Sequence, residues 1–238
     1  MALHEIEVLE NADAAARRLA EVIADRARAR VEAAGAFTVA LSGGRAPWQA
    51  FRLLAAEDVP WEQTTVYQVD ERVAPAGSDE RNLTHLQESL PAAALAVLRP
   101  MPVEADDLEQ AAAEYAASLP PRLDLVHLGL GPDGHTASLV PGDLVLDVLD
   151  RDVSVTANPY QGTRRLTLTY PLIDRSRELV WLVTGAEKAE PLRLLLAGEV
   201  SIPAGRVRTK RSLVARSGWI QRPRAAWHHE RSVPVLVA

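Results

Sequence analysis

The 238-residue chain contains no cysteine. This absence excludes disulfides, thiolate nucleophiles and cysteine-bound metals, and it suits a reducing compartment. Aromatic residues make up only 5% of the chain, whereas 47% of its residues are hydrophobic, a composition that favours a helix-rich α/β protein over a β-sandwich. No apolar run approaches the roughly 20 residues of a membrane helix, and the N-terminus lacks the pattern of a signal peptide. We therefore expect a cytoplasmic protein that does not contact a membrane.

Lysine is also scarce, because Lys188 and Lys210 are the only lysines among 26 basic residues. A lysine in this background reflects either a need for a compact ammonium group or an accident of codon usage. Eight basic residues and one acidic residue lie within 206–238, so residues 1–205 hold 18 basic and 31 acidic residues (26 minus 8, and 32 minus 1). An acidic body of this kind argues against a nucleic-acid-binding protein.

Strand-like and helix-like segments alternate along residues 1–205. This alternation predicts a single α/β domain with a Rossmann-like, mainly parallel sheet and helices on both faces. The expected strands span residues 4–9, 37–41, 65–69, 99–102, 123–130, 165–170 and 178–184. The expected helices span residues 14–31, 47–56, 82–90, 108–119 and 186–196. We assign residues 206–238 to a basic C-terminal tail.

Polar clusters follow several of these strands. They are Ser-Gly-Gly-Arg at 42–45, Asp-Glu-Arg at 70–72, Asp-Gly-His at 133–135 and a Thr-Gly pair that leads to Lys188. Ligands bind in the crevice beyond the carboxyl ends of parallel strands. If the strands are parallel, all four clusters lie along one edge of the sheet, and their convergence predicts a binding site there.

Residues 42–47 form either a phosphate-binding loop or a simple tight turn. Gly43 and Gly44 would let backbone N–H groups approach an anion, and the N-terminus of the helix that follows favours negative charge. The spacing matches neither a P-loop nor a dinucleotide-binding fingerprint.

His135 is the candidate general base. It follows an apolar strand within Gly-Pro-Asp-Gly-His, a turn that would hold the ring at the sheet edge. An imidazole titrates near neutral pH and can take a proton from water, and either Asp133 or Asp70 could orient it. His127 falls inside a predicted strand, where we expect a packed core side chain, and His85 has no supporting neighbours.

Three cations are candidates for binding an anionic substrate: Arg72, Arg165 and Lys188. Arginine offers a bidentate fork to phosphate, and lysine offers a point charge. Each has an alternative role in a surface ion pair, with Glu71 or Glu187 as partner. Arg164 could replace its neighbour at 165, because alternation along a strand lets only one of the two face the site. We find no metal-binding spacing and no Gly-x-Ser-x-Gly elbow, which favours direct attack by water.

Five segments together resemble a known family. They are LSGGRAP at 41–47, VDERVAP at 69–75 with Asn82 beyond it, LGLGPDGHTASLVPG at 128–142, RLTLTYPLI at 165–173 and VTGAEK at 183–188. In this order, and over about residues 5–205, they resemble the 6-phosphogluconolactonases of the oxidative pentose phosphate pathway. The resemblance implies a Rossmann-like fold, hydrolysis of 6-phospho-D-glucono-1,5-lactone to 6-phosphogluconate, and no metal, nucleotide or other cofactor. The partner it implies is a small sugar phosphate lactone, bound by a monomer or a weak oligomer.

The resemblance also implies roles for individual residues. His135 matches the base that activates water against the lactone carbonyl, and Asp70 and Asp133 match acidic residues near the reacting ring. The cations Arg72, Arg165 and Lys188 match positions that bind the phosphate or the sugar acid. The loop of Gly43, Gly44 and Arg45 matches the one that binds the sugar phosphate. Many relatives have serine or threonine in place of this arginine, so here a charge would replace a hydroxyl.

Two other functions remain open. Amino-sugar-6-phosphate deaminases or isomerases share a similar loop and Asp-Gly-His turn, but their turn continues into Asn-Glu-Pro-Gly, where this chain has SLVPG at 138–142. A non-catalytic sugar-phosphate-binding module would keep the cations without needing His135. The segment 218–238 departs from the family. We interpret it as a divergent tail, with an edge strand at 233–237 as the alternative.

Overall fold

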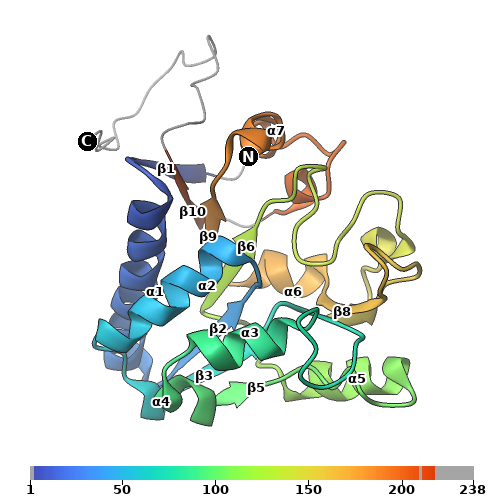
Figure 1. Ribbon diagram of the computed structural model, residues 1–238, viewed down its shortest axis with the longest axis horizontal. Coiled ribbons are helices and arrows are strands. Elements are labelled where there is room, and N and C mark those ends of the chain that lie inside the picture. The colour runs from blue at the N-terminus through green and yellow to red at the C-terminus, as the bar shows by residue number, and fades with distance from the viewer. Residues whose placement is uncertain (1–2, 209–210, 218–238) are drawn as a thin grey trace.

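The computed structural model describes residues 3–208 and 211–217. Its main sheet has seven strands in the order β1-β10-β9-β6-β2-β3-β5, and every neighbouring pair is parallel. The strands are β1 (Leu3–Leu9), β2 (Phe37–Leu41), β3 (Thr64–Gln68), β5 (Leu98–Arg99), β6 (Leu125–Gly129), β9 (Glu178–Val183) and β10 (Arg211–Ser217). The predicted parallel sheet in a single α/β domain is confirmed (Figure 1).

Helices cover both faces of this sheet, as the sequence predicted. One hydrophobic cluster joins the sheet to α1 (Ala12–Ala34), α2 (Arg45–Leu53), α3 (Asn82–Ser89) and α4 (Ala92–Ala96). The other cluster joins it to α5 (Leu108–Ser118), α6 (Tyr170–Arg175) and α7 (Ala189–Ala197). Buried residues alternate between the two clusters along β9, where Leu179 and Trp181 belong to one and Val180 to the other. A two-sided core accounts for the continuous apolar runs of these strands.

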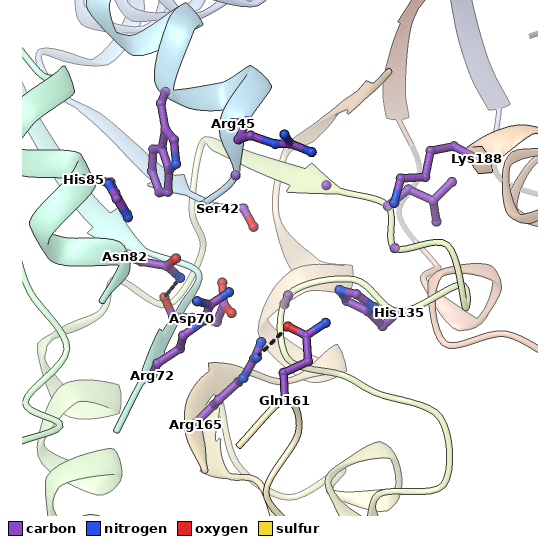
Figure 2. A pocket seen from close by; sticks show the side chains of 17 residues that line it. Ser42, Arg45, Asp70, Arg72, Asn82, His85, His135, Gln161, Arg165 and Lys188 are labelled. Atoms are coloured by element: carbon purple, nitrogen blue, oxygen red, sulfur yellow. Dashed lines mark hydrogen bonds between the residues drawn. The ribbon is translucent and has the colours of Figure 1, made fainter. Parts of the chain in front are cut away.

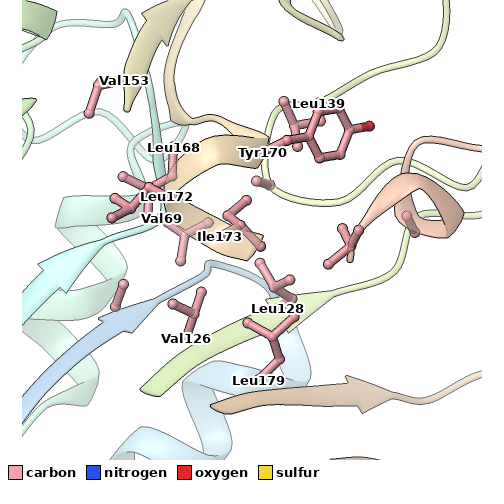
Figure 3. Close-up of a cluster of buried hydrophobic side chains, with 14 of the residues drawn as sticks. Val69, Val126, Leu128, Leu139, Val153, Leu168, Tyr170, Leu172, Ile173 and Leu179 are labelled. Atoms are coloured by element: carbon pink, nitrogen blue, oxygen red, sulfur yellow. The ribbon is translucent and has the colours of Figure 1, made fainter. Parts of the chain in front are cut away.

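The close-up in Figure 3 shows one of these core layers. Val126 and Leu128 of β6 lie below Leu172 and Ile173 of α6, and all four side chains are fully buried. Burial of such side chains contributes about 1.5–3 kcal/mol each. Because β6 sits between β9 and β2 in the middle of the sheet, the turn that follows it is held on a rigid support.

Local signals explain the limits of α1. The side chain of Asn11 accepts a hydrogen bond from the backbone N–H of Ala14, which caps the first turn. Gly35 ends the helix in a left-handed conformation with φ 77°, and its N–H donates to the carbonyl of Val31. Among the described residues, no helix is both long enough and apolar enough to cross a membrane.

Several boundaries differ from the predictions. The helix expected at 47–56 begins at Arg45 and ends at Leu53, and a 3-10 turn, Leu54–Ala56, follows it. The strand expected at 99–102 shrinks to Leu98–Arg99, because Pro100 and Pro102 have no N–H to donate to a neighbouring strand. The helix expected at 186–196 is divided into a 3-10 turn, Ala186–Lys188, and α7.

A second, antiparallel sheet was not predicted. It has the order β4-β8-β7 and consists of β4 (Asp70–Arg72), β7 (Val153–Val155) and β8 (Arg165–Leu168). The polar residues 70–72 were expected to follow a strand, but they form one themselves and pair with β8. The segment 165–170 was expected to be one strand, but Tyr170 begins α6. Strands β4 and β7 have three residues each and carry too little periodicity to be recognised in the sequence, and without them the strand expected at 165–170 had no antiparallel partner.

The predicted tail begins too early. Strand β10, which the sequence analysis placed in the basic tail, lies within the main sheet between β1 and β9. Residues 213–215 of this strand are apolar, but the charged residues Arg211 and Arg216 on either side led to its assignment to the basic tail. Residues 206–217 therefore belong at least in part to the α/β domain. The segment 218–238, with the alternative strand at 233–237, lies outside the described residues.

Candidate active site

The polar clusters predicted to converge do so around a cavity of about 530 Å³ at one edge of the main sheet. All but one of the predicted site residues line it: Gly43, Gly44, Arg45, Asp70, Arg72, His135, Arg165 and Lys188. Figure 2 shows Asp70, Arg72 and Arg165 at one end and His135 and Lys188 at the other. Asp133 does not line the cavity but contacts His135.

The loop at 43–44 needs glycine because the chain passes close to its neighbours. A Cβ on Gly43 would lie 2.2 Å from Oδ1 of Asn82 and 2.8 Å from the ring of Trp48. Gly44 has φ 135°, which disfavours any other residue. It precedes α2, whose first turn has no side-chain cap. The N–H groups of that turn are therefore suited to an anion in the cavity.

His127 supports the same loop from inside the sheet. Its Nδ1 lies 3.3 Å from the backbone nitrogen of Ser42 and accepts a hydrogen bond from it. Burial lowers the pKa of His127 to about 3, so the ring stays neutral and can accept. The predicted packed core histidine is confirmed, with the loop contact as a further finding.

Two glycines shape the turn that carries the predicted base. A Cβ on Gly131 would lie 2.0 Å from Nδ1 of His135 and 2.7 Å from Oδ1 of Asp133. The N–H of Gly131 donates to the carbonyl of His135 over 2.8 Å, which closes the turn. Gly134 has φ 81°, and a Cβ there would lie 2.5 Å from Ile202. The two glycines of Gly-Pro-Asp-Gly-His therefore leave the space in which the imidazole lies against the carboxylate.

His135 and Asp133 form a close pair. Nδ1 of the ring lies 2.5 Å from Oδ1 of Asp133, and the hydroxyl of Tyr160 donates to Oδ2 over 3.0 Å. Burial alone would raise the pKa of Asp133, but the charge and hydrogen bonds of His135 and the Tyr160 hydroxyl outweigh it and lower that pKa. A carboxylate only accepts, so Nδ1 is the nitrogen that donates to Asp133, and Nε2 is the nitrogen that can accept a proton when the ring is neutral.

Asp70 lies in a different environment. It is only 5% exposed, and the hydroxyl of Ser138 donates to its Oδ2 over 2.7 Å. Burial raises the pKa of Asp70 despite this hydrogen bond and the nearby charge of Arg165. Of the two carboxylates that the sequence offered as partners of His135, Asp133 makes the hydrogen bond.

Arg165 rather than Arg164 faces the cavity. Its Nη2 donates to the carbonyl of Tyr160 over 3.1 Å, and its Nε is buried without a hydrogen-bond partner among the described residues. The side chain of Arg164 donates instead to the carbonyl of Thr156. Burial lowers the pKa of Arg165, because desolvation disfavours the charged form of the guanidinium. A bound anion would offset this cost.

Arg72 also carries a buried Nε with no partner in the described part of the chain, while its Nη1 donates to the carbonyl of Glu80. Lys188 is partly buried, and this burial lowers its pKa. Arg45 is exposed at the start of α2, and Figure 2 shows its side chain above the cavity. The cavity is thus rich in positive charge although the chain as a whole carries −6.

Glu71 has a structural role. It is fully buried and accepts hydrogen bonds from the backbone nitrogens of Asn82 and Leu83, which caps the start of α3. The guanidinium of Arg81 lies 3.5 Å away. Neither Arg72 nor Arg165 has its side chain paired with Glu71, so both face the cavity.

Several residues at the site were missed. Trp48, His85 and Gln161 line the cavity, and Tyr160 contacts the Asp133–His135 pair from behind. Ser42 and Asn82 also line the cavity; the sequence analysis placed them in motifs but gave neither a role of its own. The expectation that His85 has no supporting neighbours is wrong, because its ring lies 5.3 Å from that of Trp48 at the cavity wall. The Gln-Gly pair at 161–162 was a turn signal that could have drawn attention to this loop.

Comparisons with known proteins agree with this geometry. Residues 10–215 match the family of glucosamine-6-phosphate isomerases/6-phosphogluconolactonase. A 6-phosphogluconolactonase of Synechocystis is 36% identical over 211 residues, covering 82% of this chain and 86% of that protein. One from Streptomyces coelicolor is 33% identical over 247 residues, covering 93% and 92%. The crystal structure of 6-phosphogluconolactonase from Thermotoga maritima superposes with a TM-score of 0.81 at 27% identity, covering 90% of this chain and all of that one.

The matched region extends into β10 as far as residue 215, which supports the place of this strand in the domain. The match also contains each polar cluster that lines the cavity. The chain therefore belongs to the glucosamine-6-phosphate isomerase/6-phosphogluconolactonase family.

Proposed function

We propose that this chain is a 6-phosphogluconolactonase, which hydrolyses 6-phospho-D-glucono-1,5-lactone to 6-phosphogluconate in the cytoplasm. One observation carries the proposal: an imidazole paired with a carboxylate lies on the wall of a cavity lined by four cations, Arg45, Arg72, Arg165 and Lys188. The relatives named above are 6-phosphogluconolactonases, and the similarity extends over most of both chains.

His135 acts as general base on a water molecule. Nδ1 donates a hydrogen bond to Asp133 and keeps its proton, so Nε2 takes a proton from the water as the water oxygen bonds to the lactone carbonyl carbon. The tetrahedral intermediate then breaks the bond to the ring oxygen, which accepts the proton from His135. The products are a carboxylic acid, which ionises at neutral pH, and a hydroxyl group, so atoms and charge balance.

The carboxylate partner supports both halves of this cycle. It holds the imidazole in the tautomer that can act as a base, and it stabilises the imidazolium that forms. Asp133 suits this role because its lowered pKa keeps it ionised at neutral pH. Asp70, buried nearby with a raised pKa, contacts the reacting sugar ring in this scheme.

The cations bind the anionic end of the substrate. Arg165 and Arg72 each have a buried Nε that makes no hydrogen bond within residues 3–208 and 211–217, and a phosphate or sugar oxygen satisfies it on binding. The turn at Gly43 and Gly44 adds backbone N–H groups at the start of α2, and Arg45 and Lys188 add charge above it.

The test is the rate of lactone opening above its spontaneous background. We expect acceleration with 6-phosphogluconolactone, measured by base uptake at constant pH, and a much smaller effect on glucono-1,5-lactone, which lacks the phosphate. Release of ammonia from glucosamine 6-phosphate without lactone hydrolysis would instead assign the chain to the deaminases. Binding of 6-phosphogluconate without any turnover would make it a binding module.

A further inference from the structure

The segment 157–163 reaches the site from a different part of the chain. It connects β7 to β8 and ends in a tight hairpin, where the N–H of Tyr160 donates to the carbonyl of Thr163 over 2.9 Å. Gln161 and Gly162 at the tip have φ 52° and 90°. Positive φ at both central residues is typical of a type I′ turn, and it costs energy at a glutamine.

A buried carboxylate anchors the base of this loop. Asp143 accepts hydrogen bonds from the backbone nitrogens of Ala157 and Asn158, over 3.0 Å and 2.9 Å. Its other bond, from the nitrogen of Val145, holds its own turn. The loop is therefore fixed two residues before Tyr160, which restricts where that side chain can lie.

Tyr160 contacts three residues of the site. Its hydroxyl donates to Oδ2 of Asp133 over 3.0 Å, and its ring meets that of His135 edge to face with centroids 5.3 Å apart. The guanidinium carbon of Arg165 lies 5.0 Å from the centre of the same ring, while Nη2 of Arg165 donates to the Tyr160 carbonyl. One residue thus joins the acid–base pair to a cation of the binding site.

We propose that Tyr160 is a positioning residue, which orients Asp133 behind His135 through its hydroxyl and holds Arg165 in place through its ring. The two oxygens of Asp133 then have separate donors, Nδ1 of His135 on Oδ1 and the Tyr160 hydroxyl on Oδ2. A carboxylate held at both oxygens cannot rotate away from the imidazole. This inference rests on the proposed function for its kinetic consequences only.

Two substitutions at Tyr160 distinguish the effect of its hydroxyl on Asp133 from the effect of its ring on Arg165. Tyr160→Phe removes the hydroxyl and keeps the ring over Arg165, so we expect kcat to fall about tenfold, the typical effect of losing a hydrogen bond to a charged group, with KM nearly unchanged. Tyr160→Ala removes the ring as well, so we expect KM for the phosphorylated lactone to rise in addition. Tyr67→Phe is the matched control, because that hydroxyl bonds the carbonyl of Ser118 away from the cavity.

A second measurement does not depend on turnover. The Tyr160 hydroxyl is one of the groups that lower the pKa of Asp133. Titration of the Asp133 carboxyl carbon by NMR should therefore show a higher pKa in Tyr160→Phe than in the parent chain, and no change in Tyr67→Phe. An Asp133 titration that is unchanged in Tyr160→Phe would overturn the proposal, whether or not the chain hydrolyses the lactone.

The outcomes distinguish this inference from the proposed function. If the parent chain opens the lactone and Tyr160→Phe does so with the same kcat, the positioning role is wrong and the function stands. If the parent chain does not open the lactone but the Asp133 pKa rises in Tyr160→Phe, the proposed function is wrong and the positioning of Asp133 stands.

Discussion

At the scale of single residues, the site contrasts two carboxylates. Asp133 is partly exposed and held by donors, so its pKa is lowered, whereas burial raises the pKa of Asp70. Sites that run acid–base chemistry at neutral pH often separate carboxylates by environment in this way. The sequence offered both as partners of His135, and the structure separates them by the hydrogen bond that Asp133 makes to the imidazole and by the deeper burial of Asp70.

The burial of Asp70 has a consequence for stability. At low pH, below about 3.8, the carboxyl is protonated in both the folded and the unfolded chain. As pH rises through that value the unfolded chain releases its proton first, so folding stability falls until the higher folded-state pKa is passed. We expect Asp70→Asn to raise the Tm at pH 7.5 by roughly 2–4 °C, the response of a domain of this size to about 1 kcal/mol.

The stabilisation by Asp70→Asn should shrink toward pH 4, and activity should fall at neutral pH. Thermal unfolding followed by circular dichroism at both pH values measures the effect, and Asp106→Asn on the exposed surface is the control. A lower Tm at pH 7.5 would contradict the account, because it would mean that the ionised carboxylate stabilises the empty site.

Some residues reach the site only because of how the chain folds, and these could not be predicted from the sequence. Tyr160 lies 25 residues after His135 and belongs to no recognisable motif. His85 lines the cavity because α3 packs beside α2, a contact that local pattern does not reveal. His135 could be predicted because its own neighbours, two glycines, a proline and an aspartate, determine its turn.

At the scale of elements, the turn after β6 determines where the base lies. Gly131 has no room for a side chain, because its Cβ would occupy the space of the His135 imidazole. We expect Gly131→Ala to lower kcat about 100-fold by displacing the ring, since an error of 1 Å in position can have that effect. Steady-state kinetics with a far-UV spectrum and a Tm for each variant make the measurement.

Gly129→Ala serves as the control for folding, because a Cβ there meets nothing within 4 Å. Both variants should have Tm values close to that of the parent chain. Wild-type kcat in Gly131→Ala would show that the turn tolerates a shift of the imidazole, and the close packing of this turn would then have no catalytic importance.

The elements themselves were predictable where they are regular. Strands β2, β6 and β9 are largely apolar on both faces, and this pattern located the motifs that begin where these strands end. The antiparallel sheet escaped prediction because Glu71 in β4 is charged yet fully buried, satisfied by backbone donors that only the folded chain supplies. Arg165 was nevertheless placed correctly, since alternation along a strand holds in either sheet.

At the scale of the whole molecule, β10 joins the two ends of the described chain, because this last strand pairs with the first one, β1. It pairs with β1 on one side and β9 on the other, and β1 has no other strand partner among the described residues. We expect a chain ending at Ser217 to fold and keep its activity. We expect a chain ending at Arg208 to lose cooperative unfolding, because it would leave β1 without its strand partner and β9 paired on one side only, with β6.

Circular dichroism and urea unfolding of the two truncated chains make this test. A cooperative, fully active chain ending at Arg208 would contradict the assignment of β10 to the domain. Loss of folding in the chain ending at Ser217 would show that the domain extends into 218–238, contrary to the sequence interpretation of that segment as a tail.

In the proposed reaction, a cationic cavity and the imidazole of His135 on its wall open a phosphorylated lactone. The most direct test is the rate of 6-phosphogluconolactone opening above background by the parent chain and by His135→Ala. We expect the parent chain to accelerate the reaction and the variant to lose about 100-fold to 10,000-fold in kcat, the usual contribution of a general base. Acceleration that survives intact in His135→Ala would contradict the account of the base.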